Sequence, residues 1–149
     1  MDNLAQQVRI RLLEDTDLGG IIALDEQIGG IYRPEVWERR IGYYLRRDPE
    51  AQVVAEAGGK VVGFMLGEVR SGEFGLEEPT GWIEVLGVDS GFRGQSVGRQ
   101  LADHMLSYFE QRGVKIVRTL VDETMGDIAA FFNRLGFEAA PIRSFVKHL

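Results

Sequence analysis

The segment from Trp82 to Val121 constrains the fold of this chain more than any other part of the sequence. It begins with WIEVLGV, which is apolar except for one glutamate and is typical of a central strand covered on both faces. An amphipathic helix pattern follows from Val97 and ends at Gly113, after which VKIVRTLV predicts a second strand. A strand, a helix and a strand in this order need a right-handed crossover, so we expect the two strands to be parallel.

Two further strands are predicted to pair antiparallel. The run AQVVAEAGGKVVGFMLGEV has two β-rich halves around Gly58-Gly59, a strong hairpin signal. The other predicted elements are a strand at Val8–Leu12, a helix from Asp15 or Asp17 to Ile28, a helix from Pro34 that ends before Pro49, a helix from Ile128 to Leu135 and one or two strands around Pro141. Together they predict one α/β (α+β) domain over residues 1–149: a mixed, mostly antiparallel sheet of about six to seven strands with about four helices on both faces.

The composition excludes several classes of protein. A net charge of −6 argues against general nucleic-acid binding. The chain has no cysteine, which rules out disulfides and a cysteine nucleophile and fits a cytoplasmic setting, and His104 and His148 are too far apart to suggest a metal site. The start, MDNLAQQVRIRL, lacks the features of a signal peptide, and no apolar stretch approaches the roughly 18 residues of a membrane span. We therefore expect neither a nucleic-acid nor a membrane partner.

The helix entrance after the WIEVLGV strand is the first candidate site. The first N–H groups of a helix have no partner within it, and the aligned peptide dipoles add a partial positive charge there. In GFRGQSVG, small residues let a ligand approach the backbone from Gly94 to Gly98, and Arg93 adds a positive charge. This pattern predicts a phosphate or pyrophosphate site. The alternative is that Gly94 forms a turn and Gly98 packs closely on the sheet, and the residues alone favour neither interpretation.

Two motifs resemble those of the GNAT (GCN5-related N-acetyltransferase) superfamily. RGQSVG after VLGVDSGF is similar to its acyl-CoA-binding pattern, which is Arg or Gln, two variable residues, Gly, one variable residue, then Gly or Ala. Arg93 and Gly98 match the pattern, and Ser96 replaces the middle glycine. A later segment, DIAAFFNRLGFE, resembles the superfamily's helix that ends in a Leu-Gly-Phe-like turn. Because the order of elements also agrees along nearly the whole chain, the sequence is identified as a GNAT-like domain.

The resemblance implies acetyl-CoA as co-substrate, with its pyrophosphate on the helix entrance. The residues that correspond to this cofactor site are Arg93, Gly94, Gln95, Ser96, Val97 and Gly98. The resemblance also implies that backbone groups of Leu86, Gly87 and Val88 bind the pantetheine arm, and that an N–H near Val88 stabilises the oxyanion. Gly87 taken alone is equally well explained by packing, and a left-handed conformation at Ser96 would be strained.

Acetyl transfer to an amine needs a base, because an amine with a pKa near ~10.4 is mostly protonated at neutral pH. Glu84 is our candidate, directly or through a water, because it lies in an otherwise apolar strand where desolvation would raise its pKa. Strand alternation predicts that it shares a face with Trp82, Leu86 and Val88. The alternative is a glutamate that is paired to an arginine or faces solvent. Glu26, at the end of the first helix, is the second candidate, and a solvated helix face explains it more simply.

The chain departs from the superfamily at the general acid. Many members carry a tyrosine four residues before the glycine of the second motif, which protonates the leaving thiolate, and Phe132 occupies this position. Met125 also replaces a common asparagine, so we expect one side-chain contact to the cofactor to be absent. Water or another tyrosine, Tyr32 or Tyr108, would have to substitute for the acid, although core packing explains Tyr108 better. A thiol with a pKa near ~8.5 still leaves tolerably without an acid.

The acceptor site is expected, by the same resemblance, between Ile28–Pro34 and Ala139–Ser144, with Tyr32 lining the amine channel and Glu26 near it. We therefore predict an N-acetyltransferase acting on a primary amine, which is a protein N-terminus, a lysine or a small molecule. One alternative is a GNAT-like module that binds acyl-CoA with weak or no transfer, which Phe132 and Ser96 favour. The other is an interaction domain without a ligand. The sequence leaves a homodimer open.

Overall fold

The computed structural model describes residues 7–149; residues 1–6, the start of the segment assessed for a signal peptide, lie outside the described residues. The strands are β1 (Arg9–Leu12), β2 (Val53–Ala57), β3 (Lys60–Arg70), β4 (Thr80–Val88) and β5 (Ile116–Thr119). The helices are α1 (Leu18–Gly29), α2 (Pro34–Arg47), α3 (Val97–Gln111) and α4 (Gly126–Arg134), with 3-10 turns η1 (Asp15–Asp17), η2 (Glu73–Gly75) and η3 (Ser90–Phe92). None of the helices in the described range is long and apolar enough to cross a bilayer.

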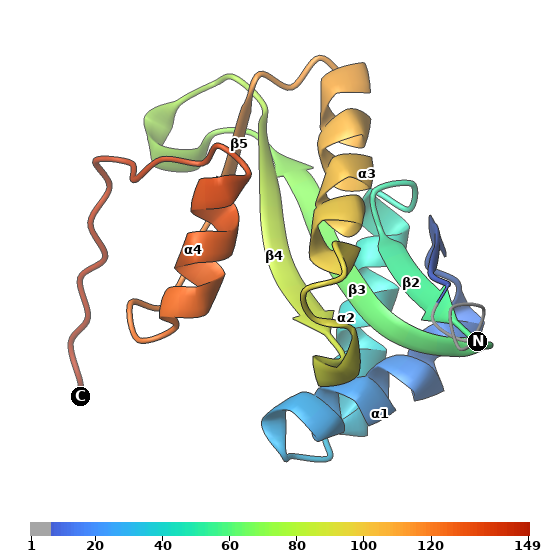
Figure 1. Ribbon diagram of the computed structural model, residues 1–149. Helices are drawn as coiled ribbons and strands as arrows, with labels where there is room; N and C mark the ends of the chain where they lie inside the picture. The colour runs from blue at the N-terminus through green and yellow to red at the C-terminus, as the bar shows by residue number, and fades with distance from the viewer. Residues whose placement is uncertain (1–6) are drawn as a thin grey trace.

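The strands form one mixed sheet in the order β1-β2-β3-β4-β5 (Figure 1). The pairs β1–β2, β2–β3 and β3–β4 are antiparallel, whereas β4 and β5 are parallel and joined through α3. The predicted hairpin is confirmed, because Ala57 pairs with Lys60 across Gly58 and Gly59, whose φ angles are 58° and 77°. The parallel strand-helix-strand unit is also as predicted.

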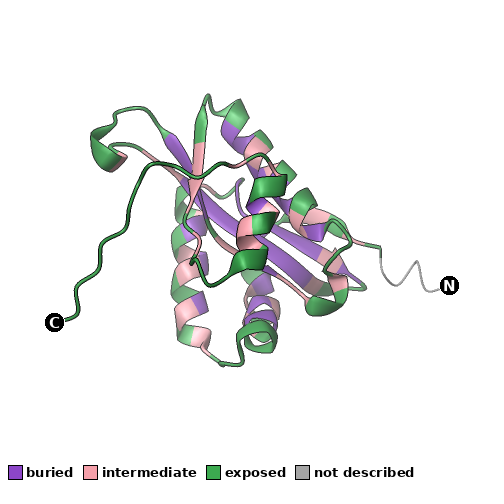
Figure 2. Ribbon diagram, turned by 60° about the vertical axis from the view of Figure 1, so that its left-hand side comes forward, coloured by how far each residue is buried: buried purple, intermediate pink, exposed green. Residues whose placement is uncertain are grey.

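Helices cover both faces of the sheet. On the first face, which we call the α1–α2 face, the core includes Trp37, Phe64 and Leu66. On the second, the α3–α4 face, the core includes Met105 and Phe109. The central strands between these two cores are largely buried (Figure 2). Coverage on both sides explains why the β4 segment reads as a nearly continuous apolar run.

The start of α1 is anchored by an ion pair instead of a side-chain cap. Asp17 stands directly before α1, as predicted, but it makes no cap hydrogen bond to the helix. Its carboxylate accepts hydrogen bonds from both terminal nitrogens of Arg11, each at 2.8 Å, and from the N–H of Glu14 at 2.9 Å. The Asp17 side chain is only 8% exposed, so this pair ties β1 firmly to the start of the first helix.

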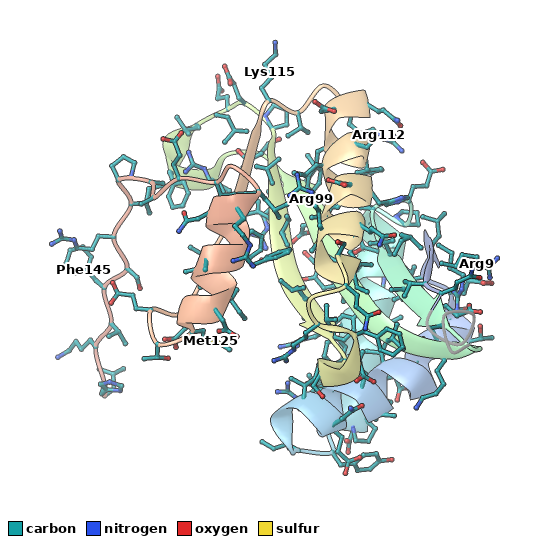
Figure 3. All side chains as sticks on the ribbon, in the orientation of Figure 1. Arg9, Arg99, Arg112, Lys115, Met125 and Phe145 are labelled. Carbon is teal, nitrogen blue, oxygen red and sulfur yellow. The ribbon has the colours of Figure 1, made fainter. Side chains whose placement is uncertain are left out.

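The prediction of one or two terminal strands is wrong. Residues 138–149 form neither helix nor strand, and the sheet of the described chain has five strands where we expected six to seven. This segment leaves the body of the molecule beyond α4, and Phe145 on it is 88% exposed (Figure 3). Two features explain the outcome: Pro141 has no N–H to donate to a ladder, and the adjacent Phe145 and Val146 break the alternation that a half-buried strand needs.

Candidate functional site

The loop between β4 and α3 is held in shape by hydrogen bonds within itself. Asp89 follows β4, and its side chain accepts a hydrogen bond from the N–H of Gly91 at 2.8 Å. The Asp89 carbonyl accepts another from the N–H of Phe92 at 2.8 Å. Gln95 Nε2 donates to the Gly91 carbonyl at 3.3 Å. These hydrogen bonds give the loop a defined path into α3.

A row of unpaired backbone donors lies at the start of α3. The first hydrogen bond of the helix runs from the N–H of Gln100 to the carbonyl of Ser96 at 2.9 Å. The N–H groups from Gly94 to Arg99 donate to no acceptor within residues 7–149. These donors stand at the positive end of a 15-residue helix, an arrangement that binds phosphate groups.

Ser96 adopts the left-handed conformation that the sequence analysis identified as strained. Its φ and ψ are 65° and 14°, and it occupies the position just before α3. Gly94, two residues earlier, has a φ of 80°. Left-handed residues in such a turn bring successive N–H groups to one side of the chain, where they form a concave site for an anion. The geometry of the motif is thus kept although serine replaces the usual glycine.

Arg93 and Gly98 flank this row. The Arg93 side chain is exposed, and its Nε donates to the Val88 carbonyl at 3.4 Å, which holds the guanidinium beside the end of β4. A Cβ on Gly98 would lie 3.0 Å from the ring of Phe131 on α4. Close packing of Gly98 is therefore confirmed, although its neighbour is α4 and not the sheet.

β4 separates from β5 halfway along its length. β5 pairs with β4 only as far as Ile83, where Thr119 Oγ1 donates to the Ile83 carbonyl at 2.9 Å. From Glu84 to Val88, β4 has β3 as its one strand neighbour in the described chain. Leu86, Gly87 and Val88, the residues predicted to bind the pantetheine arm, all lie on this unpaired edge. The predicted contacts stay predictions, but the backbone edge that they need is present.

Gly87 also has a packing role. A Cβ at this position would lie 2.9 Å from the ring of Phe64 and 3.2 Å from Cδ1 of Ile28. The end of α1 therefore lies directly over β4 here, which brings the loop that follows α1 next to the unpaired edge. Tyr32 stands in that loop and is 65% exposed, so it is available to an acceptor.

A β-bulge at Glu84 reverses the alternation of β4. The register with β3 skips Glu84, which therefore has no partner residue. After the bulge, Val85 packs with the core of the α1–α2 face, whereas Leu86 and Val88 pack with the core of the α3–α4 face. We predicted that Glu84 shares a face of the sheet with Trp82, Leu86 and Val88. This prediction is wrong for Leu86 and Val88, because the extra residue in the bulge moves the side chains that follow it to the opposite face.

The side chain of Glu84 lies on the α1–α2 face, where it meets Arg70 and Tyr44. Arg70 forms an ion pair with the Glu84 carboxylate, and the Tyr44 hydroxyl donates to it at 3.3 Å. Burial raises the pKa of Glu84 above its ordinary value of 4.5; Arg70 opposes this rise, and the neighbouring carboxylate of Glu68 adds to it. Arginine pairing and a raised pKa, which the sequence analysis treated as alternatives, thus occur together.

Behind Glu84 lies a buried carboxylate that the sequence analysis missed. Glu68 is 1% exposed and forms ion pairs with Arg47 Nε at 3.0 Å and with Arg70 Nε at 2.9 Å. The Tyr43 hydroxyl donates to Glu68 at 2.8 Å. The sequence does contain a signal for this buried ion pair. Glu68 and Arg70 are charged residues in an otherwise apolar strand, and side chains two positions apart in a strand lie on the same face of the sheet. Tyr44 gave no such signal, since it lies in the apolar stripe of its helix.

Two other predicted acceptor-site features form no hydrogen bond or ion pair with Glu84 in the described chain. Glu26 is exposed on α1, and neither an ion pair nor a hydrogen bond joins it to Glu84. The predicted contribution of Ala139–Ser144 is contradicted, because these residues are exposed in the terminal segment that leaves the body of the molecule.

No hydroxyl stands at the expected position of the general acid. Phe132 is buried and packs edge-to-face against Phe131 and Phe137, at 5.1 and 5.2 Å between ring centroids. Tyr108 is a core residue, as we favoured: its hydroxyl donates to Asp48 at 2.6 Å, and burial with this hydrogen bond raises its pKa to about 12. Met125 stands directly before α4 and is 48% exposed (Figure 3).

Known proteins match this chain in both sequence and fold. A model of the acetyltransferase (GNAT) family matches residues 20–137. The chain is 34% identical over 90 residues to the mycothiol acetyltransferase of Thermobispora bispora, an alignment that covers 60% of this chain and 30% of that protein. It is 30% identical over 108 residues to an uncharacterized N-acetyltransferase of Methanocaldococcus jannaschii, covering 72% of this chain and 48% of the relative. The chain thus spans less than half of the length of either relative.

The solved structure of an aminoglycoside N-acetyltransferase in complex with CoA superposes on this chain with a TM-score of 0.82. Its sequence is 21% identical, and the match covers 95% of each chain. At this level of identity the likeness concerns the fold.

Proposed function

The chain belongs to the acetyltransferase (GNAT) family, and from this premise we propose that it transfers the acetyl group of acetyl-CoA to a primary amine. The acceptor amine belongs to a small molecule, a lysine or a protein N-terminus. Two of the similar proteins are named a mycothiol acetyltransferase and an aminoglycoside N-acetyltransferase, and the second name specifies transfer to nitrogen. The absence of cysteine supports a cytoplasmic setting and a reaction without an acyl-cysteine intermediate.

The observation that carries the proposal is the row of unpaired N–H groups from Gly94 to Arg99. A pyrophosphate needs many donors and a positive potential, and the start of α3 supplies both, with the Arg93 guanidinium beside it. The unpaired edge of β4 from Leu86 to Val88 continues from this loop toward the middle of the sheet. These two features support a cofactor whose pyrophosphate lies at the start of α3 and whose pantetheine arm lies along β4.

Acetyl-CoA supplies the acetyl group as a thioester. Glu84 accepts the proton of the attacking amine, directly or through a water, in its carboxylate form. The free edge of β4 near Val88 offers an N–H to the oxygen of the tetrahedral species, where one such donor is typically worth about 3–4 kcal/mol. The thiolate then leaves and takes up a proton from water, since Phe132 has none to give.

A second function is favoured by one observation. Because Phe132 is buried and has no hydroxyl, the chain lacks the usual acid, and a module that binds acyl-CoA without efficient transfer would have the same architecture. Amine-dependent release of free thiol from acetyl-CoA separates the two functions. We expect release with at least one acceptor of a broad amine panel, with the acetylated product detected by mass spectrometry; cofactor binding without release across the panel would favour the binding module.

Arg93→Ala tests the cofactor site directly. We expect the affinity for CoA to fall about 10- to 100-fold, because a charge-assisted hydrogen bond to phosphate contributes roughly 1.5–3 kcal/mol. Isothermal titration measures this affinity, and pantetheine, which lacks the pyrophosphate, should bind both proteins equally. Arg112→Ala, a change on the exposed far end of α3, is the matched control. Undiminished CoA affinity in Arg93→Ala would contradict the assigned role.

A further inference from the structure

A group of three side chains on the α1–α2 face lies apart from the helix entrance. Phe74, in the loop between β3 and β4, lies 6.2 Å from the ring of Trp82 between centroids, and the Arg118 guanidinium is 5.5 Å from the Phe74 ring. Trp82 on β4 and Arg118 on β5 are register partners, so their side chains are neighbours on one face of the sheet. We refer to Phe74, Trp82 and Arg118 as the aromatic–arginine cluster.

Two donors in this cluster are buried without an acceptor. Trp82 is 3% exposed, yet its Nε1 has no hydrogen-bond partner among residues 7–149. The Nε of Arg118 is also buried and has no partner in the same range. Buried donors are nearly always paired in native proteins, so two unpaired ones on adjacent residues indicate an acceptor that comes from outside the chain.

The charge of Arg118 points to an anionic acceptor. Arg33, Arg47 and Arg70 each form an ion pair with a carboxylate, whereas Arg118 forms none within the described residues. Arg118 is half-buried, and a guanidinium removed from water without a carboxylate partner is unfavourable. A carboxylate has two oxygens, one for each of the unpaired donors, and its charge would balance that of the guanidinium.

The cluster adjoins the proposed base. Trp82 and Glu84 are two residues apart on β4, and Arg70 connects them, since its guanidinium lies 5.1 Å from the Trp82 ring and pairs with Glu84. Two residues of extended strand span roughly 7 Å. A molecule whose amine reaches Glu84 can therefore place a second group at the cluster. Phe74, which is 54% exposed and has a φ of 55°, covers this position from the loop.

We propose that the aromatic–arginine cluster binds a carboxylate of the acceptor, which makes the substrate an amine that also carries a carboxylate. The proposal rests on the acetyltransferase function above and specifies its acceptor class. Trp82 Nε1 and Arg118 Nε donate to the carboxylate oxygens, while the amine lies toward Glu84. A diamine, which the carboxylates of Glu68 and Glu84 alone would favour, leaves both donors unpaired.

Matched pairs of amines test this class. L-lysine and cadaverine differ only by a carboxylate, as do L-ornithine and putrescine, and 4-aminobutyrate and propylamine. We expect the carboxylated member of at least one pair to bind about 10- to 100-fold more tightly, as measured by isothermal titration with and without CoA. Arg118→Met should abolish this preference, and Trp82→Phe, which keeps the ring and removes the N–H, should reduce it several-fold. Arg112→Met, which removes an arginine elsewhere, should leave it unchanged.

Three results would overturn the proposal: no carboxylated amine binds, the carboxylated member binds no more tightly than its counterpart in any of the three pairs, or the preference persists in both Arg118→Met and Trp82→Phe. O-phosphoethanolamine is a further ligand in the same titration, and tighter binding of it than of every carboxylated amine would reject the carboxylate. Because these titrations need neither turnover nor CoA, their outcome is independent of the acetyltransferase assay. A failure of CoA binding would count against the proposed function alone.

Discussion

Ser96 shows how a single residue can keep a motif's geometry against its own preference. A left-handed backbone costs an L-residue about 1–2 kcal/mol, and Ser96 holds a φ of 65° without a side-chain hydrogen bond to the helix. The conformation is therefore maintained by its surroundings, with Val97 buried on one side and the bonded loop on the other. Arg93, by contrast, adopts no strained backbone; for its predicted role in phosphate binding it needs only an exposed side chain and its hydrogen bond to the end of β4.

Ser96→Gly should stabilise the protein. Glycine adopts positive φ without strain, and after subtraction of its greater freedom in the unfolded chain we expect a gain of about 0.5–1 kcal/mol in the free energy of unfolding. Urea denaturation measures this change. Ser96→Ala retains the Cβ and should bring no gain. A lower stability in Ser96→Gly would mean that the serine side chain has a favourable role in the loop.

The pH dependence of acetyl transfer should report on Glu84. The base must be deprotonated, so the rate falls as pH drops through a pKa that burial has raised above 4.5. Arg70→Met removes the cation that favours the carboxylate, so the acid limb of the kcat profile should move to higher pH. Glu84→Gln should lower kcat about 100-fold or more and remove the limb, with CoA affinity unchanged. An acid limb that survives in Glu84→Gln would exclude Glu84 as the base.

At the scale of elements, the sequence predicts those features of the fold that depend only on residues close together in the chain. Gly58-Gly59 dictates a tight turn, and the spacing of apolar residues fixed the helices and the parallel unit. The helix entrance was also predictable, because its donors are consecutive backbone groups. The bulge at Glu84 was not, since it depends on how β3 pairs with β4. Arg70, Tyr44 and Arg118 come from three different elements, so no stretch of sequence shows that they share a face with Glu84.

The connection between β1 and α1 should depend on pH through Asp17. Arg11 holds the pKa of Asp17 below its ordinary value of 3.8. A carboxyl whose pKa is depressed on folding stabilises the protein above its unfolded pKa, and this contribution is lost as pH falls through the folded value. Asp17→Asn should therefore lower the free energy of unfolding by about 1.5–3 kcal/mol at pH 7, with the difference shrinking below pH ~4. Asp15→Asn, an exposed neighbour, should show neither effect; equal effects of the two changes would contradict the ion-pair explanation.

At the scale of the whole molecule, stability comes from two cores that sandwich the sheet, and the terminal segment belongs to neither. Residues 138–149 are exposed throughout and form no helix or strand. The one or two strands expected around Pro141 do not form, and β5 stands at an edge of the sheet in the described chain.

Removal of residues 139–149 should therefore leave the protein folded. We expect the midpoint of thermal unfolding to change by no more than about 2 °C, since little apolar surface is lost from the interior. Differential scanning calorimetry at several protein concentrations checks this result. A large, concentration-dependent fall would show that the segment is buried in an assembly of chains.

The extra residue at Glu84 inverts the side-chain alternation of β4, so Val85 packs on the α1–α2 face, whereas Leu86 and Val88 pack on the α3–α4 face. A donor held at the start of α3, which follows the end of β4, and an acceptor held beside Trp82, near the start of β4, would meet the strand at different positions, so neither obstructs the entry of the other. For an enzyme built in this way, both substrates occupy one ternary complex, and steady-state kinetics are sequential, with intersecting double-reciprocal lines. The acetylated product and the free coenzyme would then depart by separate exits.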